Sequence, residues 1–146
     1  MQSTSRLIDA DIDTVWSVLA DGWLYPLFVV GASRMREVDD SWPAPGSRLH
    51  HSVGSWPVLI NDDTSVLAAE PPTRLQLRAR AWPSGEAEVE FNLRAEGDKT
   101  LVEIREDAVA GPAKLLPTVA RHPMLAWRNK ETLRRLAYVA ERRGTR

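Results

Sequence analysis

The stretch EAEVEFNLRAEGDKTLVEIREDA, residues 86–108, decides the fold of this chain. Along its first half, apolar residues alternate with charged or polar ones, which is the period of a β-strand with one solvated face. Gly97 and the aspartate after it supply a turn, and the alternation then resumes. On the return strand Val102 and Ile104 share the inner phase, and Glu106 shares it with them. The stretch predicts an antiparallel hairpin whose apolar face carries one carboxylate.

Further strand patterns precede this hairpin. They lie at 4–8, 33–38, 48–53, 58–69 and 75–81. Two short helices are expected between the first two strands, at 12–19 and within 23–30, and Asp9 and Asp11 offer caps for the first of them. After a linker with several prolines, one long amphipathic helix is expected from 124 to 143. The order predicts an α+β fold in which a curved antiparallel sheet of about seven strands wraps around one C-terminal helix.

The ratio of sheet to helix predicts a cavity. A curved sheet of this size presents more apolar concave surface than a single helix can fill. The usual occupant of a mostly apolar cavity is a small hydrophobic ligand. We therefore expect a ligand-binding cavity between the sheet and the C-terminal helix.

Composition sets the outer limits. The 146 residues fit a single domain, 1–146, and 19 basic against 20 acidic residues leave a net charge of -1, which does not favour a nucleic acid partner. There is no cysteine, so disulfides, a thiolate nucleophile and cysteine-ligated zinc are excluded. No stretch approaches the roughly 18 apolar residues of a membrane span, and the amino terminus lacks an apolar signal core. A cytoplasmic protein without stable membrane insertion is expected.

Three segments of the chain resemble one known family. They are the strand exit and first helix at 9–19, the connection EPPTRL at 70–75 and the segment WRNKETL at 127–133 of the last helix. In this order they resemble the helix-grip fold of the START and Bet v 1-like (SRPBCC) superfamily. Within it, the chain is most similar to the bacterial polyketide cyclase, dehydrase and lipid-transport family. The resemblance implies a scaffold shared by carriers and enzymes, and none of the three segments is a catalytic signature.

Polar residues in the inward phase are the candidates for chemistry. If the strand phases hold, His51, Asp62, Thr64 and Glu106 point inward, and Asn129 joins them from the last helix. A histidine beside a carboxylate is suited to general base catalysis of an enolisation, a dehydration or a ring closure. His51, Glu106 and Asp62 are therefore the catalytic candidates.

Two other interpretations of the same residues stay open. Glu106 is also suited to a buried structural ion pair with Arg128 or His51, since inward charges are normally satisfied rather than catalytic. Alternatively, the polar group orients a ligand without reacting. The remaining candidate ligand contacts are the apolar residues Leu77, Phe91 and Leu133, with Trp23 at an entrance. No residue spacing indicates a metal site or a cofactor.

Three functions follow from this pattern. The first is binding of a hydrophobic or amphipathic small molecule that is polyketide-like, aromatic or lipid. The second is a cofactor-free cyclase or dehydratase, and the third is an interaction domain similar to a chaperone cofactor, a role that relatives of this fold also have. Exposed Leu67, Leu101 or Trp127 would further be compatible with a homodimer.

Overall fold

The computed structural model describes residues 2–24, 34–55, 58–81, 85–110 and 118–144. Its elements, in chain order, are β1 (Gln2–Ile8), α1 (Ile12–Leu19), η1 (Gly22–Leu24), β2 (Arg34–Val38), β3 (Arg48–Ser55), β4 (Val58–Glu70), β5 (Arg74–Ala81), β6 (Gly85–Glu96), β7 (Lys99–Ala110) and α3 (Thr118–Gly144). The predicted helix-grip fold is confirmed. Of the second short helix expected within 23–30, the described residues contain only the three-residue 3-10 turn η1.

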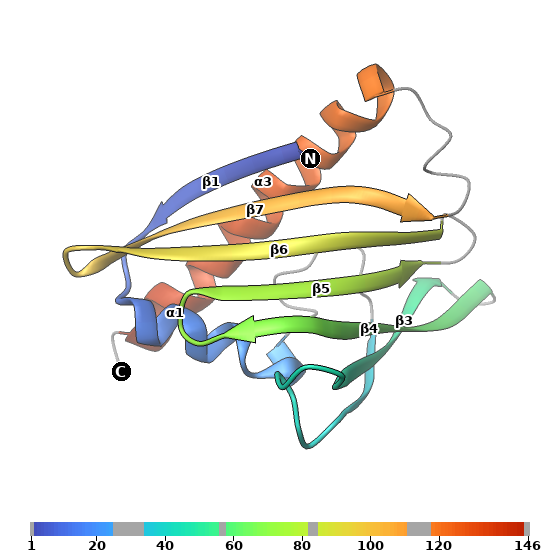
Figure 1. Ribbon diagram of the computed structural model, residues 1–146, viewed down its shortest axis with the longest axis horizontal. Coiled ribbons are helices and arrows are strands. Elements are labelled where there is room, and N and C mark those ends of the chain that lie inside the picture. Colours follow the sequence, from blue (N-terminus) through green and yellow to red (C-terminus); the bar gives the residue numbers. More distant parts are fainter. Residues whose placement is uncertain (1, 25–33, 56–57, 82–84, 111–117, 145–146) are drawn as a thin grey trace.

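The seven strands form one antiparallel sheet in the order β1-β7-β6-β5-β4-β3-β2 (Figure 1). Strands β2 to β7 follow one another as a meander, and β1 closes the order by pairing with β7. The β6–β7 hairpin turns at Gly97, whose φ of 66° is a left-handed value that glycine adopts at little cost. The hairpin that residues 86–108 predicted is therefore present, with Phe91 opposite Ile104.

The long helix α3 packs on one face of the sheet. It crosses behind the sheet in Figure 1, packs against β1 and β7, and meets α1 near its carboxyl end. Its buried stripe follows the helical period, and the members are Asn129, Thr132, Leu133, Leu136, Ala137 and Ala140. The helix begins at Thr118, six residues before the expected residue 124, so Pro123 lies inside it.

The core is apolar at the end of the sheet where α1 and α3 meet. There the alternation of β5, β6 and β7 buries Leu75, Phe91, Leu93, Val102 and Ile104 against the helices. The opposite face of the same strands carries cross-strand ion pairs, such as Arg78 Nη2 to Glu86 Oε2 at 2.5 Å. These pairs are partly exposed to solvent and each contributes little, so burial of the inner face supplies most of the stability.

Gly22 allows η1 to approach the sheet closely. A Cβ atom built on this buried glycine would collide with Leu49 and would lie 2.8 Å from Val38 Cγ1 and 3.3 Å from Trp42 Cδ1. We expect Gly22→Ala to lower the free energy of unfolding by about 1–3 kcal/mol, which is the usual cost of overpacking a core. Urea denaturation measures this loss, and an unchanged midpoint would show that η1 can move away from the sheet.

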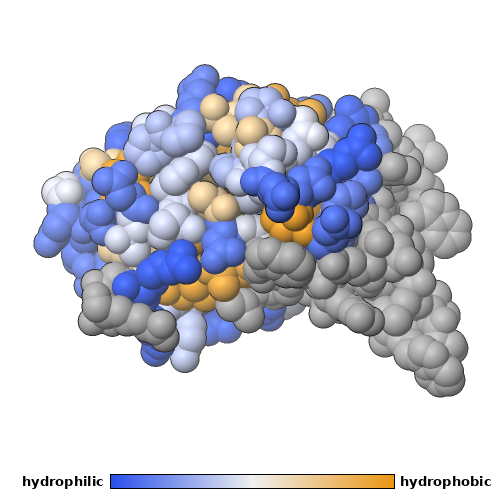
Figure 2. All heavy atoms as spheres, turned by 90° about the horizontal axis from the view of Figure 1, so that it is seen from below, coloured by the Kyte–Doolittle hydropathy of each residue, from blue (hydrophilic) through white to orange (hydrophobic). Residues whose placement is uncertain are grey.

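The surface combines hydrophilic residues with small apolar areas. Figure 2 shows one face, on which hydrophobic residues form separate small patches between hydrophilic ones. The large exposed hydrophobic side chains of the described residues are Leu7, Leu67, Trp127 and Tyr138. Tyr138 is covered by the guanidinium of Arg142, 3.4 Å from the ring centroid. None of the helices within the described residues is both long and apolar enough to span a bilayer.

Candidate functional site

A buried ion pair joins β7 to α3. Glu106 is 1% exposed and lies in the sheet between Gln2 of β1 and Val89 of β6. Its Oε1 contacts Nη2 of Arg128, which reaches down from α3. The side chain of Arg128 is 39% exposed, so the pair connects the interior with the molecular surface. Of the two partners considered for Glu106 in the sequence, the structure places Arg128 in contact with it.

The next residue of α3 adds an unusual donor. Asn129 is 3% exposed, and its Nδ2 has no hydrogen-bond partner within the described part of the chain. Thr132, one turn further along, is also buried. Beyond these residues the buried stripe of α3 becomes wholly apolar, starting with Leu133. Among the described side chains of α3, the two polar members of the buried stripe therefore precede its apolar members. We call Glu106, Arg128, Asn129 and Thr132 the polar cluster.

Beside Glu106, the side chains on the inner face of the sheet become shorter and less buried. Register places Leu77, Val89 and Glu106 side by side in one row across β5, β6 and β7. In the next row toward the end of β5, Ala79 is opposite Ala87. Leu77 is buried, whereas Val89 and both alanines are only partly buried. Glu106 therefore lies at the border between the fully buried part of the inner face and a part with short, partly exposed side chains.

The structure places the predicted site residues in three groups. Glu106 and Asn129 belong to the polar cluster, while Thr64 is fully buried on β4, two strands away from β6. The expected apolar contacts are core residues, and they are Leu77, Phe91 and Leu133. His51 and Asp62 are backbone register partners across β3 and β4, but their side chains and that of Trp23 lie outside the described residues.

Arg128 and Thr132 were not proposed as site residues from the sequence. Arg128 was considered only as a structural partner, and Thr132 gave no signal beyond its place on the helical stripe. The helical period from Leu136 back through Leu133 and Asn129 was the signal that identified this face. In the described ranges, no set of three or more His, Asp and Glu side chains gathers as a metal-binding cluster would.

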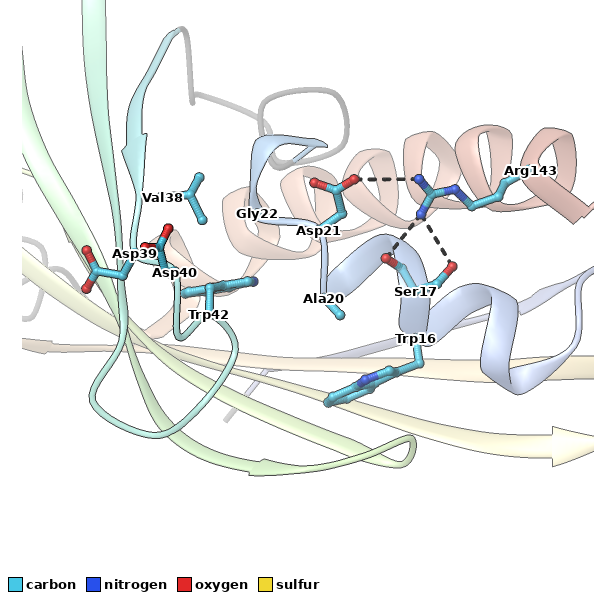
Figure 3. A pocket seen from close by; sticks show the side chains of 10 residues that line it. All are labelled: Trp16, Ser17, Ala20, Asp21, Gly22, Val38, Asp39, Asp40, Trp42 and Arg143. Carbon is cyan, nitrogen blue, oxygen red and sulfur yellow. Dashed lines mark hydrogen bonds and ion pairs between the residues drawn. The ribbon is translucent and has the colours of Figure 1, made fainter.

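A hollow lies near the carboxyl end of α3. It is an open cleft of about 570 Å³ between α1, η1, the turn after β2 and the carboxyl end of α3 (Figure 3). Trp16 and Trp42 contribute its aromatic walls, and Asp39 and Asp40 line one side. Trp42 is 9% exposed and its Nε1 donates to Leu19 O at 3.2 Å, so this indole packs as core rather than standing free at a rim.

Arg143 connects the two helices beside this cleft. Its Nη1 donates to Ser17 O at 3.1 Å, and its Nη2 lies 3.5 Å from Asp21 Oδ2 (Figure 3). The pair is partly exposed, so it contributes little to stability. Its effect is to hold the last turn of α3 against α1.

Asp39, which follows β2, forms hydrogen bonds with the start of β3. Its Oδ2 accepts a hydrogen bond from the backbone of Arg48 at 2.9 Å, and its Oδ1 lies 3.1 Å from His50 Nε2. The hydrogen bond with His50, supported by that from Arg48, holds the pKa of Asp39 below its ordinary value although desolvation opposes this. The ionised form of Asp39 is therefore favoured by folding.

This shift predicts how an Asp39→Asn variant depends on pH. In the unfolded chain an aspartate titrates near about 3.9, and the folded value is lower, so the stabilisation is present above that pH and is lost as pH falls through the folded pKa. We expect the difference in Tm between wild type and variant to be largest between about pH 5 and 7 and to shrink below about pH 4. Thermal melts followed by circular dichroism measure it. A difference that stays constant to pH 3 would show that charge does not matter here.

Comparisons with known proteins give structural likeness only. No protein-family model matches the chain, and no curated protein matches it in sequence. Among solved structures, protein NE0264 from Nitrosomonas europaea has 14% identity and a TM-score of 0.75, with 99% of this chain and 96% of that chain covered. Ara h 8.0201 has 10% identity and a TM-score of 0.70, with 94% and 95% covered.

A third likeness is to the di-domain ARO/CYC StfQ from the steffimycin biosynthetic pathway, with 11% identity and a TM-score of 0.72. Here 99% of this chain matches 51% of StfQ, so the chain spans about half the length of that protein. At such identities the likeness shows the fold. The chain therefore shares its fold with Ara h 8.0201 and with about half of ARO/CYC StfQ, which confirms the Bet v 1-like fold that the sequence resemblance predicted.

Proposed function

We propose that this protein binds a small hydrophobic or amphipathic molecule, of polyketide-like, aromatic or lipid type, between the inner face of the sheet and α3. The observation that carries the proposal is the position of the polar cluster. Glu106 is almost fully buried in the sheet row that precedes the smaller Ala79 and Ala87, and Asn129 is buried on α3 next to the arginine that contacts Glu106. An apolar space with a few placed polar groups is the usual form of a small-molecule site.

The contact between Glu106 and Arg128 favours binding over catalysis by this carboxylate. The Glu106 side chain is buried, and its negative charge is stabilised there by the guanidinium of Arg128. Because Oε1 of Glu106 is engaged by the guanidinium, this oxygen is not free to accept a proton from a substrate. The pair is better suited to forming one wall of the site and to fixing α3 over β7.

Mass spectrometry and thermal shift together test the proposal. We expect native mass spectra of protein purified from its own host, without organic solvent, to show a bound small molecule that disappears on denaturation. Adding a true ligand at about 100 times its Kd should stabilise the protein by about 2.7 kcal/mol. The absence of any bound molecule, together with no shift in Tm across a panel of lipids, polyketides and aromatic compounds, would contradict the proposal.

An enzymatic alternative rests on a separate observation. His51 and Asp62 are register partners on neighbouring strands, an arrangement in which an imidazole and a carboxylate can act as one acid–base pair. In this case, His51→Ala should abolish conversion of a bound substrate while its Kd changes little. Mass spectrometry of the ligand before and after incubation would detect such conversion. Equal loss of binding and conversion would instead indicate a structural role for His51.

A further inference from the structure

We propose that Asn129 makes this site selective for ligands that carry a neutral oxygen acceptor, such as a ketone, an ester or an amide carbonyl, over both hydrocarbons and carboxylates. The inference rests on the proposed function, because it names the class of ligand for that same site. It follows from two features of the polar cluster, namely a buried donor without a partner and a charge pair that is already balanced.

The donor is the first feature. Asn129 is 3% exposed, and its Nδ2 finds no acceptor among the described residues. Leaving a buried N–H group unsatisfied is costly, and nearly all such groups in folded proteins have a partner. Leu133 and Leu136 on the same helix stripe are packed into the core. A leucine at position 129 would therefore be expected to stabilise the fold at least as well as the asparagine does. A donor at this position is explained by an acceptor that a ligand brings.

The charge balance is the second feature. The carboxylate of Glu106 and the guanidinium of Arg128 are in direct contact, so the site has no uncompensated positive charge from this pair. A ligand carboxylate would have to leave water, approach the buried Glu106 charge and compete with it for Arg128. A neutral carbonyl pays a much smaller desolvation cost and still accepts the Asn129 hydrogen bond. The cluster therefore favours a polar but uncharged ligand group.

Three probes of one size separate these possibilities. They are 2-acetonaphthalene, 2-isopropenylnaphthalene and 2-naphthoate, which present a ketone, a hydrocarbon and a carboxylate of the same number of heavy atoms on the same ring system. We expect titration calorimetry at pH 7 to give wild-type protein a Kd for the ketone that is about tenfold lower than for the hydrocarbon, with the carboxylate weakest. In Asn129→Leu, the ketone and the hydrocarbon should bind within about twofold of each other.

A matched variant controls for the substitution itself. Asn92→Leu changes the same residue type on β6, where the amide donates to Glu90 Oε1 at 2.8 Å on the other face of the sheet. It should keep the wild-type order of the three probes. Ligand-free Asn129→Leu should have a Tm no lower than wild type, because it removes an unpartnered donor; Asn129→Ala provides a second, smaller replacement if the leucine does not fit.

Each outcome bears on a different claim. If none of the probes binds wild-type protein, and the panel of lipids and polyketides fails as well, the proposed function is overturned and this inference with it. If the ketone and the hydrocarbon bind equally well to wild type, or the preference persists in both Asn129 variants, only the inference is wrong. Tightest binding of 2-naphthoate would overturn the argument from charge. A strongly lowered Tm of both ligand-free variants would show that Asn129 supports the fold instead.

Discussion

Arg128→Met should lower the free energy of unfolding by about 3–5 kcal/mol, the largest effect we expect from a single substitution on the helix surface. Glu106 is 1% exposed, so loss of Arg128 leaves its charge buried without this partner. Methionine keeps much of the length and apolar surface of the arginine stem, so the loss reports the charge rather than packing. Guanidinium chloride titration with linear extrapolation measures it.

The same exchange at Arg134 is the control. Arg134 lies on the exposed face of the same helix, and it pairs only at the surface, with Glu131. Pairs of this kind contribute about 0–1 kcal/mol, so Arg134→Met should be close to neutral. The double variant Glu106→Leu/Arg128→Met should recover much of the lost stability, because no buried charge remains. Similar losses from Arg128→Met and Arg134→Met would show that Glu106 reaches water or another partner.

Ala87→Phe should reduce ligand affinity at least about tenfold, equivalent to about 1.4 kcal/mol of binding free energy. Ala87 is opposite Ala79, one row from Glu106, where the inner face is only partly buried. A phenyl ring at this position would occupy the space that we assign to the ligand. With 2-acetonaphthalene as the probe, calorimetry compares Kd for wild type and variant, and circular dichroism shows whether the sheet is retained.

Ala95→Phe controls for the added ring on the same strand. Ala95 is exposed near the β6–β7 turn, far along β6 from Ala87. This variant should bind the probe as wild type does. If Ala87→Phe keeps full affinity with an intact sheet, the ligand site lies elsewhere, and the cleft between α1 and the turn after β2 becomes the next candidate.

The element order was predictable because it depends on local patterns. Alternation with period two around Phe91, and helical spacing around Leu133 and Leu136, are visible in single segments of about ten residues. The inward phase of Glu106 followed from the same alternation and is confirmed by its burial. The start of α3 was wrong by six residues, because the sequence assigned 118–123 to the linker with several prolines, whereas the helix runs through Pro123.

The candidate site was predictable only as a set of possible members. Alternation shows that a residue faces inward, but it does not show which inward residues are neighbours. The structure separates Thr64 on β4 from Glu106 on β7, and it selects Arg128 as the partner of Glu106.

The sequence by itself determined the class of fold and the composition of each face, because strand and helix periods are properties of consecutive residues. Tertiary structure alone decided that α3 lies over β1 and β7, that Arg128 contacts Glu106, and that the Nδ2 of Asn129 has no partner among the described residues. These contacts join residues about 20 positions apart or more, and they depend on how the sheet curves and where one helix crosses it. The curvature and the crossing arise from packing of the whole chain, which no local pattern records.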